Sequence, residues 1–146
     1  MMASAPQFGS QANPVLIPWR AEAGMAPGGV RVVLRLEGAA AFAAALALYA
    51  HAGFSWPVFA LFLLAPDLSM LAYLAGPRLG AVGYNIVHTY ISALALVLGG
   101  FLGGAPAATA AGLIWVAHIG LDRALGYGLK YATSFSDTHL GHVGPR

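Results

Sequence analysis

The sequence predicts an all-α membrane protein: a four-helix transmembrane bundle with a disordered N-terminal tail. The first observation is compositional, since 59% of the 146 residues are hydrophobic and only 8% are charged, whereas a soluble domain carries about 25% charged residues. The second is that four stretches each supply the roughly 20 mainly apolar residues that a membrane helix needs. The third is that the connections between them are short and carry Gly or Pro, as antiparallel neighbours require.

The four expected spans follow one another after a polar start. They cover residues 31–52, 55–75, 79–101 and 106–130. Pro66 is expected to kink the second span, which neighbouring helices can tolerate. Residues 1–29 are rich in Pro, Gly, Ala and Ser and lack the long apolar core of a signal peptide, so we expect a disordered cytoplasmic tail there. The membrane domain then occupies 30–131, and 132–146 form a cytoplasmic C-terminal tail.

Charge predicts the orientation of the bundle. With four spans, both termini and the loop between the second and third spans lie on one side. All seven basic residues belong to that side: Arg20, Arg31, Arg35, Arg78, Arg123, Lys130 and Arg146. The positive-inside rule makes that side cytoplasmic, so we expect a multi-pass protein of the inner (cytoplasmic) membrane. The basic residues form no stripe for nucleic acid, and the absence of cysteine excludes disulfides, zinc–thiolate sites and iron–sulfur clusters.

Three ionisable residues from three different spans are expected at a similar depth. At about 1.5 Å per helical residue, Asp67 lies roughly 16 Å and His88 roughly 15 Å from Arg78. On the same estimate, His118 lies roughly 18 Å from Lys130. Ionisable groups inside a bilayer are costly, so their coincidence in depth indicates a shared function.

More polar residues are expected one layer nearer the cytoplasm. Asn85 lies three residues before His88, and Asp122 lies four residues after His118, so each pair shares a helix face. Glu37 belongs to the same layer in the first span. If these faces converge, the bundle encloses a polar pocket that opens to the cytoplasm.

The residue types in this pocket suit a metal ion. Imidazole nitrogens and carboxylate oxygens are ligands for a divalent ion such as Zn, Mn or Fe. The candidate ligands are Asp67, His88, His118 and Asp122. Glu37, or a ligand carboxylate, is the candidate general base. A proton relay or small-molecule site is a second interpretation, and haem held by the two histidines is a third.

Several of these residues also have simpler interpretations. Asp67 could bond the backbone amides freed at the proline kink, and Glu37 could pair with Arg35 at the interface. Arg123 is expected to extend its guanidinium to the membrane surface. The segment after the fourth span is either a flexible tail or a lid that folds back and brings His139 towards the pocket.

Two long motifs resemble a known family. They are "PDLSMLAYLAGPRLGAVGYNIVHTY" at 66–90 and "WVAHIGLDRALGYGLKYATSFSDTHLG" at 115–141. They are similar to an uncharacterised bacterial family of small integral membrane proteins, domain of unknown function 4260, over about 31–141. This resemblance implies the membrane class and carries no activity.

A looser resemblance concerns the order of the polar motifs. PD, then HT, then H-x3-D is similar to the membrane-bound metal-dependent hydrolases. Carried over, it implies metal ligands at Asp67, His88, His118 and Asp122. The sequence departs from that family at Ser69, where a second Asp is usual, and at Ile86 and Val87, where an HR pair is expected.

Two function classes follow. The first is a metal-dependent hydrolase with a lipid-like substrate drawn from the bilayer. The alternative is a non-enzymatic membrane protein, either a proton-coupled carrier or a subunit whose polar cluster packs helices or binds a partner. Runs of small residues, "GAAAFAAALA" and "PAATAAG", are typical of close helix packing and favour a second copy of the chain or a larger membrane complex.

Overall fold

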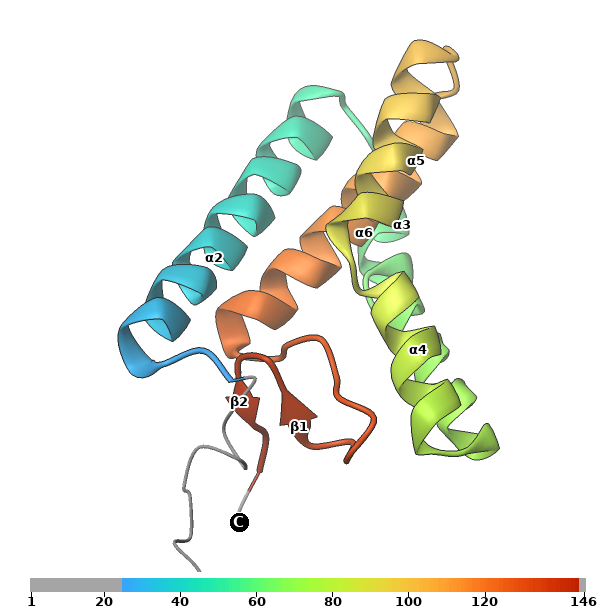
Figure 1. The fold of residues 1–146 in the computed structure, drawn as a ribbon. Helices are drawn as coiled ribbons and strands as arrows, with labels where there is room; N and C mark the ends of the chain where they lie inside the picture. Colours follow the sequence, from blue (N-terminus) through green and yellow to red (C-terminus); the bar gives the residue numbers. More distant parts are fainter. Residues whose placement is uncertain (1–24, 145–146) are drawn as a thin grey trace, which may run out of the picture.

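The structure, a computed structural model, describes residues 25–144, which form helices and one short hairpin (Figure 1). The elements are α2 (Gly28–His51), α3 (Trp56–Phe62), the 3₁₀ helix η1 (Ala65–Ala75), α4 (Pro77–Val87), α5 (Tyr90–Leu102), α6 (Pro106–Leu125), β1 (Asp137–Thr138) and β2 (Gly141–His142). The all-α fold with four long helical segments is confirmed, because α3–η1 and α4–α5 are the second and third. Most of the expected N-terminal tail, residues 1–24, lies outside the described residues.

The last long helix, α6, forms the centre of the bundle, and α2 and α5 pack along it (Figure 1). Glycines make the close approach possible. A Cβ atom on Gly120 would lie 2.6 Å from the backbone nitrogen of Phe42 in α2, and one on Gly112 would lie 2.7 Å from that of Val97 in α5. Small residues therefore pack helices within this chain, and a role for other small-residue faces between copies stays a prediction.

Both middle segments are broken helices. The second changes from α3 to η1 next to Pro66, where the kink was expected. The third is interrupted at His88 and Thr89, between α4 and α5, with neither proline nor glycine at the break. η1 packs against α4, with Gly80 so close to the ring of Tyr73 that a Cβ atom would overlap it. The two broken helices are thus neighbours in the sequence, and parts of them, η1 and α4, also pack against each other.

The surface of these helices is that of a membrane protein. Three segments are long and apolar enough to cross a bilayer: Gly28–His51, Trp56–Ala75 and Pro77–Leu102. Large apolar side chains are strongly exposed on them, including Leu61, Leu74 and Ile91. The central helix α6 differs because it carries the buried polar residues His118 and Arg123. A water-soluble protein seldom exposes so much continuous apolar surface, so the apolar helices belong in a lipid bilayer.

The chain after α6 departs from the expected span. The helix ends at Leu125 because Gly126 adopts a left-handed conformation with φ of 102°. The fourth span was expected to continue to residue 130, and that boundary was wrong. Residues beyond it fold back: β1 pairs with β2 in an antiparallel hairpin, and Lys130 bridges to Thr138. Leu140 is buried. Of the two interpretations of this segment, the described residues favour a folded one.

Candidate metal centre

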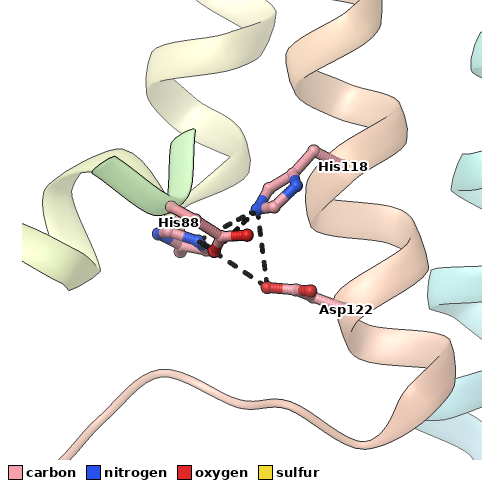
Figure 2. Close-up of side chains that lie close together, drawn as sticks. His88, His118 and Asp122 are labelled. Atoms are coloured by element: carbon pink, nitrogen blue, oxygen red, sulfur yellow. Dashed lines mark hydrogen bonds and ion pairs between the residues drawn. The ribbon is translucent and has the colours of Figure 1, made fainter. Parts of the chain in front are cut away.

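Four side chains from three segments of the bundle meet at one point. Figure 2 labels three of them, His88, His118 and Asp122. Asp67 lies in the first turn of η1, directly after the break in the second segment. His88 directly follows the last residue of α4, at the break in the third segment. His118 and Asp122 lie one turn apart on the unbroken helix α6. The sequence proposed these four residues as ligands, and the structure brings all four together.

The distances between their polar atoms are short and similar. His88 Nε2 lies 3.1 Å from His118 Nε2, 3.4 Å from Asp67 Oδ1 and 3.6 Å from Asp122 Oδ2. His118 Nε2 lies 3.5 Å from Asp67 Oδ1 and 3.7 Å from Asp122 Oδ2. One nitrogen or oxygen atom of each residue lies within 4.8 Å of all the others. Five of the six distances among these four atoms thus lie between 3.1 and 3.7 Å, a spacing that suits a tetrahedral set of ligands.

The spacing of these four atoms fits a first-row metal ion. In a regular tetrahedron whose corners lie about 2.1 Å from the centre, the usual zinc-to-nitrogen or zinc-to-oxygen distance, each edge is about 3.4 Å long. The five distances given above run from 3.1 to 3.7 Å. An ion at the centre would therefore reach all four atoms with only small side-chain adjustments.

The backbone fixes how His88 presents its ring. His88 Nδ1 lies 3.0 Å from the carbonyl oxygen of Tyr84, which can only accept, so Nδ1 donates this hydrogen bond. In the neutral imidazole, Nε2 then carries a lone pair, and Nε2 is the atom that faces the two carboxylates. A lone pair directed at carboxylate oxygens is repulsive unless a cation or a proton lies between them. Metal-bound histidines commonly use such a hydrogen bond to hold their orientation.

Tyr84 also supports the site through its side chain. Its ring stacks on the His88 ring, with centroids 3.7 Å apart and planes 11° from parallel. Its hydroxyl donates to Asp122 Oδ2 at 3.3 Å. Tyr84 thus contacts two of the four candidate ligands. Its spacing from His88, four residues along one helix, is a sequence feature that could have identified it.

Burial differs among the four residues and gives the site a direction. The side chains of His88 and His118 are 1% and 2% exposed, that of Asp122 is 18% exposed and that of Asp67 is 34% exposed. The imidazoles therefore form the floor of the site. Asp67 is the most exposed of the four and lies on the open side of the site.

The break beside His88 frees backbone carbonyls, and side chains satisfy them. Ser92 Oγ donates to the carbonyl of Ile86 at 3.0 Å, and Trp115 Nε1 donates to that of Val87 at 2.7 Å. Arg123 donates to the carbonyl of His88 at 3.0 Å.

Arg123 is a correction to the sequence analysis. We expected it to extend to the membrane surface, but it is only 9% exposed. Besides the His88 carbonyl, its guanidinium donates to the carbonyl of Tyr127 at 3.1 Å. Two backbone acceptors hold it inside the bundle, so it supports the break.

Two other residues of the predicted pocket lie apart from the four. Glu37 is exposed on α2 and does not belong to the cluster of four; its role as general base stays a prediction. Asn85 exchanges two hydrogen bonds with the backbone of Lys130, donating at 2.9 Å and accepting at 2.7 Å. Asn85 therefore anchors the C-terminal segment to α4.

Lys130 and the segment that follows it cover the end of the bundle nearest the site. Lys130 is buried, its Nζ donates to the carbonyl of Phe135 at 2.8 Å, and it lies 4.9 Å from the centre of the Tyr84 ring. The Phe135 ring packs edge-on against Tyr73 of η1. His139 accepts a hydrogen bond from the backbone of Leu129 through Nδ1; it is not one of the four residues of the cluster.

Comparison with known proteins adds a family to this geometry. No curated protein and no solved structure matches the chain. A family model described as "Domain of unknown function" matches residues 31–143, which include every helix after the first turn of α2 and all four residues of the cluster. The chain therefore belongs to this family, DUF4260.

Proposed function

We propose that Asp67, His88, His118 and Asp122 bind one divalent metal ion, and that the chain is a metal-dependent hydrolase acting on a lipid-like substrate. The observation that carries the proposal is the convergence of four donor atoms from Asp67, His88, His118 and Asp122, all within 4.8 Å of one another. The donor set, two imidazoles and two carboxylates, suits Zn, Mn or Fe. Such an ion, when bound, polarises a carbonyl or phosphoryl group and activates water.

Electrostatics supports a cation at this place. Two carboxylates and a lone pair on His88 converge beside buried imidazoles, and uncompensated charge of this kind is expensive inside a membrane protein. The fixed Nδ1 hydrogen bond of His88 leaves Nε2 as an acceptor towards the cluster. A divalent ion removes the repulsion among these groups and orders them.

The more exposed carboxylate is the better candidate for proton transfer. A general base must lie within hydrogen-bonding reach of the water that it activates. Asp67 contributes Oδ1 to the cluster, has a second carboxylate oxygen and is the most exposed of the four. We therefore assign the base to Asp67 and keep Glu37, exposed on α2, as the alternative. Hydrolysis that survives Glu37→Gln would exclude Glu37 as the base and leave a ligand carboxylate, whereas hydrolysis that is lost in Glu37→Gln while the metal is retained would favour Glu37.

The orientation proposed for the bundle follows from where its cations lie. Arg31 and Arg35 are in the first turns of α2, Arg78 is in the first turn of α4, and Lys130 follows α6. We propose that this end faces the cytoplasm in the inner membrane. Because the chain lacks cysteine, a single cysteine at Gly53, between α2 and α3, should react with an impermeant maleimide from outside intact cells. If this cysteine reacted only after the cells were lysed, the bundle would have the opposite orientation.

The decisive experiment is metal analysis of the full chain purified in detergent. We expect one equivalent of Zn, Mn or Fe, retained in His51→Ala, an exposed histidine outside the cluster, and lost in His118→Ala and in the nearly isosteric Asp67→Asn. Chelation should lower the thermal unfolding temperature of the wild type and leave that of Asp67→Asn unchanged. Folded wild-type protein that stays metal-free in the presence of all three ions overturns the proposal. A proton-bridged cluster in a non-enzymatic membrane protein would then explain the geometry.

A further inference from the structure

An apolar cavity of about 560 Å³ lies beside the candidate metal centre. It is bounded by α3, by the start of η1, by the end of α4 and by α5 and α6, and every side chain that lines it is apolar. Alanines at three positions of α6 make room for it: Ala107, Ala110 and Ala111. A cavity of this size is within the range of small-molecule sites.

The cavity shares its wall with the metal centre. Pro66 and Val87 line it, and each directly precedes a candidate ligand, Asp67 and His88. Trp115, also in the wall, lies three residues before His118 on the same helix. The cavity and the polar cluster therefore meet at the two helix breaks.

The wall of the cavity extends along α6 away from the metal centre. It runs from residue 115 back to residue 107 on that helix, which corresponds to about 12 Å. The indole N–H of Trp115 already donates to the carbonyl of Val87, so it offers no polar contact to an occupant. The shape and chemistry suit a single hydrocarbon chain whose polar end lies at the metal.

The position of the cavity also indicates which class of molecule can bind in it. It opens between segments long and apolar enough to cross a bilayer. The molecules that reach such an opening are lipids, and an all-apolar wall excludes a polar solute because it offers no hydrogen bonds in exchange for water. This position therefore favours hydrocarbon that enters laterally from the bilayer.

We propose that this cavity binds the hydrocarbon chain of a single-chain amphiphile and places its head group at the metal centre. This inference rests on the proposed function and specifies its substrate class. The acyl or alkyl chain lies along α6 between Ala107 and Trp115. The bond to be hydrolysed lies at the head-group end, beside Asp67 and His88.

The test uses the full chain in phosphatidylcholine vesicles and a palmitate analogue that carries a photoreactive diazirine in its chain. After irradiation, we expect saturable labelling of peptides that contain residues 107–115 and 58–66, which unlabelled palmitate prevents. Ala111→Trp should fill the cavity and reduce this labelling severalfold. Ala44→Trp, at an exposed alanine of α2 outside the cavity, is the matched control and should label as the wild type does.

Each outcome decides one proposal. Labelling spread over all exposed helix faces, without saturation, overturns the chain-binding site. If Ala111→Trp fails to fold, Ala107→Phe replaces it, and labelling unchanged in a folded cavity variant also overturns the site. Wild type that binds metal without saturable labelling leaves the metal centre standing and removes the substrate class. Saturable labelling of a wild-type protein that binds no metal keeps the chain-binding site and removes the metal centre.

Discussion

Tyr84→Phe tests the second layer of the candidate metal centre with the smallest available change. The substitution removes the hydroxyl that donates to Asp122 Oδ2 at 3.3 Å. It keeps the ring that stacks on His88 and the backbone carbonyl that accepts from His88 Nδ1. Any loss of metal affinity therefore reports the single hydrogen bond to Asp122.

The expected magnitude follows from the length of that bond. Loss of a group that orients a metal ligand typically costs about 10- to 100-fold in affinity. A strong hydrogen bond from a hydroxyl to a carboxylate is about 2.5–2.7 Å long, and the 3.3 Å contact of Tyr84 is longer. We therefore expect the low end of the range, about tenfold, or about 1.4 kcal/mol.

The assay is competition for the metal ion between the purified protein and a chelator of known affinity. Tyr49→Phe is the matched control, because Tyr49 is also buried and its hydroxyl donates to the carbonyl of Ser55 at 2.8 Å, outside the cluster. We expect its metal affinity to equal that of the wild type. Equal affinities for Tyr84→Phe and wild type would refute the argument that Asp122 binds the ion in the orientation that the structure shows.

Two further predictions concern the bundle and its C-terminal segment. Gly120→Ala should destabilise the protein by about 1–3 kcal/mol, because the new Cβ atom would lie 2.6 Å from the backbone nitrogen of Phe42. Gly99 has open space around it, so Gly99→Ala is the control and should be neutral or stabilising. Equal unfolding temperatures of the two variants in detergent would contradict this prediction. Burial, together with nearby Arg123, lowers the pKa of His139 below its usual 6.5. The unfolded segment then binds more protons than the folded one, so its stability is complete above about pH 6.5 and falls as pH drops towards the folded pKa. Hydrogen exchange of residues 127–144 should accelerate on acidification in the wild type and much less in His139→Gln; equal acceleration in both would exclude His139 as the cause.

The main features of the fold could be predicted because the bilayer restricts what a chain can do. A span must be long, apolar and helical, so composition and length locate the segments. The depths of the ionisable residues could be predicted for a related reason. An ionisable group inside a bilayer needs a partner, and the rise per residue placed Asp67, His88 and His118 at one level. The structure brings them within hydrogen-bonding range, and their role as metal ligands stays a prediction.

Other features depend on which face of a helix meets which neighbour, and depth alone does not contain that information. Glu37 has a suitable depth but lies on an exposed face of α2. Asn85 shares a face with His88, yet its amide pairs with the backbone of Lys130 because α6 ends early at Gly126. A left-handed glycine and a returning segment are tertiary events that hydropathy does not reveal.

The break in the third segment explains why α6 carries so many polar residues. A helix interrupted at His88 exposes carbonyl groups that a bilayer cannot satisfy, and each would cost several kcal/mol if left unpaired. Trp115 and Arg123, both on α6, donate to the carbonyls of Val87 and His88. His118 and Asp122 lie between and beside them on the same helix.

One face of α6 therefore stabilises the break and supplies half of the cluster. The break, in turn, lets His88 leave the helical path, with its Nδ1 held by Tyr84 and its Nε2 directed at His118. An uninterrupted α4–α5 helix would leave the donors of Trp115 and Arg123 without these acceptors, and an apolar α6 would leave the broken backbone unsatisfied. His118 and Asp122 lie on α6 between and beside the two donors that satisfy the break, so the candidate metal centre forms at the point where α6 stabilises the broken helix.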